Sequence, residues 1–186
     1  MAAAARVIAR QGPADFTLAD VGREVGLAAA TLSQRFGSKR ELLLALVASG
    51  TATVSRLFQE ARTRHQSPLS ALEDALLQHV RTFGRPEELA NYIAFLHLDL
   101  MDPEFHRYAK AQAAALRWEI ERLLAEAVRR REVATPDVRL LARAVQVAYN
   151  GALLTWAVER DGSVAGRVRE AVSAVLDPAR VAARRR

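Results

Sequence analysis

Few residues of this chain have the types and spacing that catalysis or metal binding requires. The 186 residues include no cysteine, which excludes disulfides, iron–sulfur clusters, thiol catalysis and cysteine-ligated zinc. Two histidines and three carboxylates do lie close together, at His97, Asp99, Asp102, Glu104 and His106. Their spacing matches no metal-binding motif, and Asp102 is better explained as the cap of a helix that begins at the following proline. We therefore expect no metal and no cofactor.

Motifs of the common enzyme classes are also missing from the sequence. It contains no glycine-rich phosphate loop, no nucleophile elbow, no His-Glu-x-x-His pair and no Glu-x-x-His pair of the kind that binds two iron ions. We expect a protein that is not an enzyme.

The composition is that of a folded protein in water. Hydrophobic residues make up 51% of the chain and charged residues 26%, which argues against wholesale disorder. The longest strictly apolar run, Leu42 to Ala48, is far shorter than the roughly 20 residues of a membrane-spanning helix. The first residues do not have the pattern of a secretory signal. We expect a soluble, cytoplasmic protein.

Positive charge is concentrated at the two ends of the chain. Residues 1–40 contain six basic and three acidic residues, and the last seven residues, from Arg180, contain four arginines. The remainder is close to neutral, which suits a polyanionic partner that meets only part of the surface. The alternative is that arginine is simply abundant throughout the chain.

Proline placement and apolar periodicity predict an all-α fold. Pro68, Pro86, Pro103 and Pro136 each precede an amphipathic stretch, and three of them follow the potential N-caps Ser67, Asp102 and Thr135. Proline suits the first position of a helix, where its missing N–H has no intrahelical partner. Apolar residues then recur every three or four positions, most regularly from Phe105 to Ala127.

The first 46 residues have a pattern of their own. Gly12, Gly26 and Gly37 each follow a short helical stretch, and Ser38 with Glu41 forms a capping box at the start of a long helix. These signals predict a three-helix unit at residues 1–46 and a helical body at residues 47–186.

Within the small unit, residues 17–39 are typical of a helix-turn-helix. We expect Thr17 to cap a helix that points Val21 and Val25 inward, and Gly26 to make the tight turn. We expect Leu27 to fill the angle between the two helices, while Leu32 and Phe36 anchor the second one. Such a second helix enters the major groove of DNA, and its outward residues here are Ala29, Ala30, Thr31, Ser33, Gln34 and Arg35.

From Ala5 to Leu46 the sequence resembles the TetR family of bacterial repressors. The resemblance is carried by Gly12, Thr17-Leu-Ala-Asp-Val, Val25-Gly-Leu27, Thr31-Leu32 and Phe36-Gly-Ser-Lys39. It implies that Thr17 and Lys39 contact DNA phosphates. It also implies that the remaining DNA-facing positions are Ala28, Ala29, Ala30, Thr31, Ser33, Gln34 and Arg35. Two of these depart from the family pattern: Ser33 stands where an aromatic residue is common, and Ala28 where a capping serine is common.

The resemblance also implies a homodimer joined by the last two helices. The apolar and small residues that favour this interface are Val145, Ala148, Ala152, Leu153, Trp156, Val164, Val168, Val172 and Val175. The alternative is that this stripe packs inside a single chain. A dimer would place two recognition helices about one DNA turn apart, on a near-palindromic operator in double-stranded DNA.

Family members usually bind a small effector between their central helices. Candidate contacts in this chain are Tyr92, Phe95, Leu96, His97, Met101, Phe105, Tyr108, Trp118, Tyr149 and Asn150. Because few charges fall among them, we expect a mostly apolar ligand. The function we expect is that of a ligand-responsive, homodimeric repressor. The alternative is a helix-turn-helix regulator that is controlled by a protein partner and has no small-molecule effector.

Overall fold

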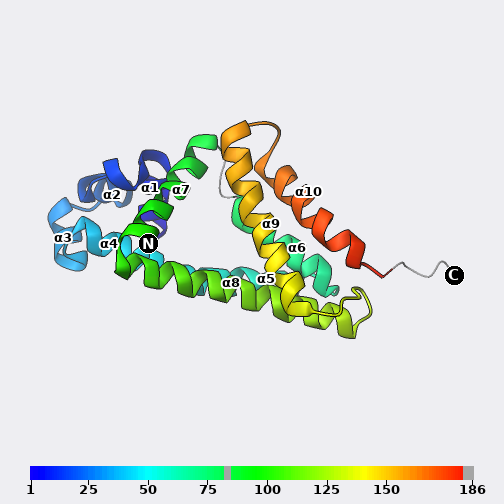
Figure 1. Cartoon of the computed structure of the whole chain (residues 1–186). Helices are drawn as coiled ribbons and strands as arrows, with labels where there is room; N and C mark the ends of the chain where they lie inside the picture. Colours follow the sequence, from blue (N-terminus) through cyan, green and yellow to red (C-terminus); the bar gives the residue numbers. More distant parts are fainter. Residues whose placement is uncertain (82–84, 182–186) are drawn as a thin grey trace. The chain divides into compact units, whose positions relative to one another are not determined.

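A computed structural model describes residues 1–81 and 85–181, apart from the side chains of residues 86, 96, 97 and 99. Every regular element in these ranges is a helix, and Val133 and Arg180 form an isolated antiparallel bridge (Figure 1). The predicted all-α fold is confirmed. The chain divides into two compact units, residues 1–51 with 84–112, and residues 52–83 with 113–186.

The first unit contains α1 (Ala2–Asp15), α2 (Leu18–Val25), α3 (Ala29–Phe36), α4 (Lys39–Ala48), α7 (Pro86–Met101) and the start of α8 (Pro103–Arg129). Capping boxes begin two of these helices, Thr17 with Asp20 at α2 and Ser38 with Glu41 at α4. The capping box predicted at Ser38 is therefore confirmed. Helix α1 is broken at Gly12, whose φ of 85° is left-handed, and it resumes at Pro13.

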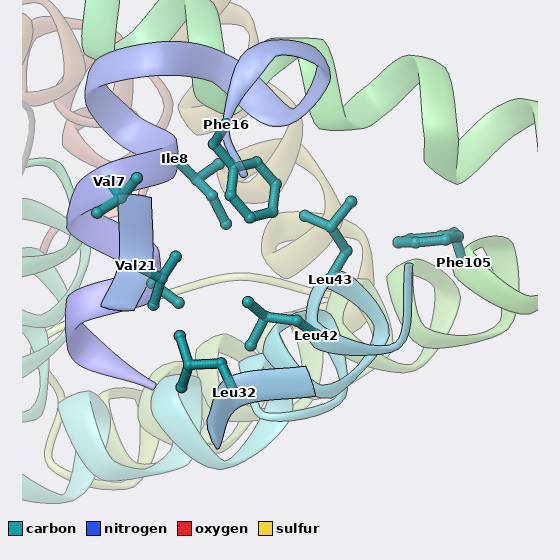
Figure 2. Packing of buried hydrophobic residues seen from close by; sticks show 9 residues of the cluster. Val7, Ile8, Phe16, Val21, Leu32, Leu42, Leu43 and Phe105 are labelled. Carbon is teal, nitrogen blue, oxygen red and sulfur yellow. The ribbon is translucent and has the colours of Figure 1, made fainter. Parts of the chain in front are cut away.

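One apolar core holds the first unit together. Figure 2 shows its side chains converging from the short N-terminal helices and from α8. Phe16 and Leu42 are fully buried at its centre, and Leu32 anchors α3 to it. Helix α7 packs along α1, where the Asn91 side-chain amide donates to the Ala9 carbonyl at 2.8 Å. This packing explains why residues 84–112 belong with the N-terminal helices.

The second unit contains α5 (Gly50–Arg64), α6 (Pro68–Val80), the rest of α8, α9 (Val138–Glu159), α10 (Val164–Leu176) and the 3₁₀ turn η1 (Asp177–Ala179). Helix α10 packs against both α9 and α6. Backbone hydrogen bonds join residues 132–134 to residues 179–181, including Val181 N to Glu132 O at 3.0 Å. The domain boundary predicted at residues 46/47 stays a prediction. Each compact unit combines two separate stretches of sequence, so the units do not correspond to the two predicted domains.

Two of the three predicted caps lie where the sequence places them. Ser67 accepts from the Ser70 N–H at the start of α6, and Asp102 accepts from the Glu104 N–H at the start of α8. The cap predicted at Thr135 is wrong, because α9 begins two residues later with Asp137 as its N-cap. The Asp137 carboxylate accepts two backbone N–H groups there, whereas the Thr135 hydroxyl bonds to the backbone of Asp137.

Among the described residues, the stretch Lys39–Arg64, which comprises α4 and α5, is long and apolar enough to cross a membrane by length and composition alone. Counting only uninterrupted apolar residues does not find this stretch. Leu42, Leu43 and Phe58 of this stretch are buried within the two units. Core helices of proteins in water have this composition too.

Candidate nucleic-acid interface

The turn between α2 and α3 is closed by backbone contact. Gly26 has the left-handed φ of 69° that lets the chain turn sharply after α2. The Leu27 N–H donates to the Gly22 carbonyl at 2.9 Å. A Cβ atom at position 22 would lie only 2.5 Å from the Leu27 carbonyl oxygen. Gly22 is therefore required for this approach, and its position inside an otherwise helical pattern is the signal that could have identified it.

Two expectations about this turn are wrong. Val25 and Leu27 are 45% and 44% exposed, although we expect both to be inside. The backbone contact at Gly22 already fills the angle, so no side chain has to enter it. Val21 and Leu32 are the residues that bury the apolar contact between α2 and α3.

All seven candidate contact residues on and just before α3 are exposed. They are Ala28, Ala29, Ala30, Thr31, Ser33, Gln34 and Arg35. Leu32 is buried between them and fixes the helix from behind. Ala28 provides no side-chain cap, as its residue type predicts, so the first N–H groups of α3 keep no side-chain partner from the N-cap. Short exposed side chains on a supported helix allow close approach to a groove.

Most arginines on the N-terminal helices of this unit are paired with carboxylates. Arg6 and Arg10 of α1 both donate to Glu24 of α2, at 2.9 and 2.7 Å. The hydrogen bonds from Arg10 and Arg6 hold the pKa of Glu24 below its usual value, so the carboxylate stays charged at neutral pH. Arg23 is likewise paired with Asp20 on its own helix.

Arg40 is also bound within the unit. Its guanidinium donates to Asp102 at 2.8 Å and to Glu104 at 2.9 Å, across the α7–α8 junction. The hydrogen bond from Arg40 lowers the pKa of Asp102. Arg35 is different: it lies 5.5 Å from the centre of the Phe36 ring, and among the described residues it has no carboxylate partner. The uncompensated positive charge of the recognition helix is therefore that of Arg35.

Thr17 is exposed, but its hydroxyl proton is already engaged. The hydroxyl and the backbone N–H of Thr17 both donate to Asp20 Oδ2, each at 2.7 Å. These two bonds lower the pKa of Asp20, which keeps a negative charge beside the predicted phosphate contact. A phosphate that meets Thr17 must therefore displace Asp20 from the hydroxyl.

Lys39 is half-buried at the head of α4. Its ammonium group donates to the Ala14 carbonyl and lies 4.7 Å from the centre of the Phe16 ring. An ammonium group has three donors, so the bond to Ala14 leaves two for a phosphate. The structure thus fixes the position of the charge that the sequence predicts for this contact.

This helix-turn-helix geometry agrees with a match in sequence. Residues 1–46 match the family model described as bacterial regulatory proteins, tetR family. Residues 1–46 are therefore a DNA-binding domain of the TetR family. TetR-family regulators are DNA-binding proteins and not enzymes, in agreement with the missing enzyme motifs. No curated protein sequence matches this chain closely enough to count as a relative.

Solved TetR-family structures share the fold over nearly the whole chain. A TetR transcription regulator from Haloarcula marismortui has a TM-score of 0.78 at 16% identity, over 97% of this chain and 95% of that one. PfmR from Thermus thermophilus has a TM-score of 0.66 at 19% identity, over 94% of each chain. A structure concerning control of antibiotic production by bacterial hormones has a TM-score of 0.77 at 19% identity, over 96% and 94%. Identities this low show the fold alone.

The candidate effector residues are divided between the two units. In the first unit, Phe105 is buried in the core, Phe95 and Tyr108 are half-buried, and Tyr92 and Met101 are exposed. Phe105 therefore serves the packing of the TetR DNA-binding unit and is not available to a ligand in this conformation. The side chains of Leu96 and His97 lie outside the described residues.

In the second unit, the three remaining candidates do not point to one place. Tyr149 is buried with its hydroxyl against Nδ1 of His79, whereas Asn150 is exposed. Trp118 is also exposed, and the Arg122 guanidinium lies 4.5 Å from its ring centre. The effector set as a whole stays a prediction.

The candidate dimer residues pack inside one chain. Val145, Ala152, Leu153, Trp156, Val164, Val168 and Val172 are buried, and Ala148 and Val175 are half-buried. They lie where α9 and α10 pack together, and α10 also packs on α6. This packing agrees with the alternative that the sequence leaves open, and the dimer itself stays a prediction.

The carboxylates near Pro103 also have a structural role. Asp102 and Glu104 both bind Arg40, and His106 is exposed. In the described ranges no group of three potential ligands lies close enough to hold a metal ion, and the side chains of His97 and Asp99 fall outside those ranges.

Replacing Lys39 with methionine is expected to weaken binding to operator and to unrelated DNA by the same factor. The substitution keeps an unbranched apolar side chain over Phe16 and removes one phosphate interaction per half-site. The slope of log affinity against log salt should fall by about one for each phosphate that no longer meets a lysine. Lys110 of α8, the other lysine of the chain, is exposed and provides the matched control Lys110→Met. An unchanged salt slope in Lys39→Met would contradict the phosphate assignment.

Proposed function

We propose that this TetR-family regulator is a cytoplasmic, homodimeric repressor that releases a near-palindromic operator when it binds a small, mostly apolar effector. The observation that carries the DNA-binding part is the α3 surface. It combines seven exposed candidate contacts with the uncompensated charge of Arg35, on a helix fixed by buried Leu32. Hydrogen-bonding and methyl groups of this kind distinguish bases in the major groove.

A continuous apolar stripe on α9 supports the dimer. Leu140, Val147, Leu154 and Val158 are exposed, with Val147 at 71% and Val158 at 84%. Their spacing of seven, seven and four residues places them on one side of α9, opposite the buried side chains that face α10. Gly151 lies on the same stripe, and a Cβ there would meet nothing within 4 Å. A second copy of the chain can approach closely at this point, so we place the interface on this stripe.

If effector binding is to change the affinity for DNA, a helix must transmit the change to the helices α1 to α3. Helix α7 meets this need, because Asn91 bonds the Ala9 carbonyl at 2.8 Å, next to the break in α1. A Cβ at Gly12 would lie 3.0 Å from Asn91 Oδ1, so the two helices have little free space there. A shift of α7 would therefore displace α1, which shares one core with α3. The likeness to a structure that concerns bacterial hormones supports a small-molecule effector.

The test is binding of the purified protein to DNA that flanks its own gene, with unrelated DNA as competitor. We expect saturable, competitor-resistant binding whose affinity falls by orders of magnitude between about 50 and 200 mM salt. Release of that DNA by the low-molecular-weight fraction of a cell extract would favour a small effector. Release only by the protein fraction would favour the alternative of a protein partner. Binding that any DNA displaces equally would contradict an operator at this locus.

A further inference from the structure

A hollow of about 540 Å³ lies in the second unit, where α5 ends, α6 begins and α8 passes beside them. Its volume is within the range of small-molecule sites. Its lining includes the charged and titratable residues Arg62, Arg64, His65, Glu126 and Arg130. None of the candidate effector residues is in this lining, so this hollow is a separate feature of the molecule.

The lining is strongly cationic. Three guanidinium groups and one imidazole face a single carboxylate, that of Glu126. Pro68, Ala71 and Leu123 add apolar surface but no charge. Each arginine is paired with a carboxylate, so an anion that enters the hollow would bind through the N–H donors that remain on these groups. The groups come from the end of α5, from the loop that follows it and from the residue after α8.

Carboxylates outside the lining orient two of the arginines. Arg62 donates to Glu119 at 2.8 Å, and Glu119 is only 3% exposed. Arg64 donates to Asp74 through two nitrogen atoms, at 3.0 and 2.8 Å, and His65 lies 3.1 Å from the same carboxylate. These partners hold the cationic groups in place without lining the hollow themselves.

The third arginine is held differently. Arg130 donates to the Gln66 carbonyl at 2.6 Å and to Glu126 at 2.7 Å. A guanidinium has five N–H donors, so each of the three arginines keeps donors beyond those that its protein partners use. Fixed guanidinium groups with spare donors suit phosphate or carboxylate oxygens, which they bind in pairs.

We propose that this hollow binds a small molecule with more than one anionic group, of the phosphorylated or polycarboxylate class. The proposal does not depend on the identity of the effector or on the operator. Such a ligand would bridge the end of α5, where Arg64 lies, and the turn that follows α8, where Arg130 lies.

Titration calorimetry of the full chain with inorganic pyrophosphate, and separately with citrate, tests this proposal at fixed ionic strength. We expect one site per chain, weakened roughly tenfold or more in Arg130→Gln and in Arg64→Gln, since each variant loses a charge-assisted hydrogen bond to the anion. Arg62 is left intact, because its removal would leave Glu119 buried without that partner. The two probes show whether phosphate or carboxylate groups are preferred.

Two control variants separate this site from general attraction of anions. Arg129 is adjacent to Arg130 and exposed but does not line the hollow, so Arg129→Gln should bind pyrophosphate as the parent protein does. Arg35→Ala should also keep this binding, which excludes a site on the DNA-binding surface. No binding of either probe by the parent protein would overturn the proposal. An equal loss in Arg129→Gln and Arg130→Gln would overturn it as well.

Discussion

Replacing Arg35 with alanine is expected to cost operator binding roughly 1–3 kcal/mol per half-site, and to relax the preference at one base position. Arg35 is the uncompensated cation of the exposed α3 surface, whereas the arginines around it are held by carboxylates. A guanidinium that donates to a guanine edge discriminates between bases, so unrelated DNA should lose much less affinity than the operator. Competition binding with operator variants that differ at single positions measures both effects.

Arg23 provides the matched control for this experiment. It is an exposed arginine of the same unit, and its guanidinium is paired with Asp20. Arg23→Ala should therefore change operator affinity far less than Arg35→Ala. An equal loss for all DNA sequences in Arg35→Ala would place this side chain on a phosphate. If Arg35→Ala binds the operator as tightly as the parent protein, Arg35 does not contact DNA.

Placing glutamates at Val147 and Leu154 together is expected to convert the proposed dimer into a folded monomer. Both side chains are exposed on the α9 stripe of a single chain, so the charges should leave the melting temperature of the monomer nearly unchanged. In the proposed dimer the same charges would be buried against each other without partners of opposite charge, which disfavours association. Sedimentation should show the monomer mass, and operator affinity should fall by two or more orders of magnitude when the second half-site is lost.

The control is Ala114→Glu, which adds a charge at an exposed position of α8, outside the α9 stripe. It should leave both the mass and the operator affinity unchanged, and circular dichroism should show that all variants are equally helical. A dimer that survives both glutamates on α9 would contradict the interface proposed for this stripe.

The sequence by itself determined the features that depend on neighbours within about four residues. A capping residue followed by proline predicts helix starts correctly at Ser67 and Asp102, and the capping box predicts the start at Ser38. The failure at Thr135 is also local: Asp137, two residues later, accepts the N–H groups of Arg139 and Leu140 and so begins the helix there. Likewise, the alternation of Leu32 with short polar residues predicted correctly which side of α3 is exposed.

Which cations remain uncompensated was decided only by the tertiary structure. Glu24 meets Arg10 from 14 residues away, and Asp102 meets Arg40 from 62 residues away. Charge counting cannot reveal such pairs, because they depend on which helices become neighbours. The net positive charge of residues 1–40 therefore does not show which cations have carboxylate partners, whereas the structure shows that Arg35 has none among the described residues.

Tertiary packing also determines which side of α9 is exposed and available to a second copy of the chain. Periodicity shows that α9 has apolar residues on more than one side, but it does not show which side is covered within the same chain. Helix α10 covers the side with Val145 and Trp156, and leaves Leu140, Val147, Leu154 and Val158 exposed. The same reason applies at Val25 and Leu27: whether an apolar side chain is buried depends on how closely two backbones approach, and Gly22 sets that distance.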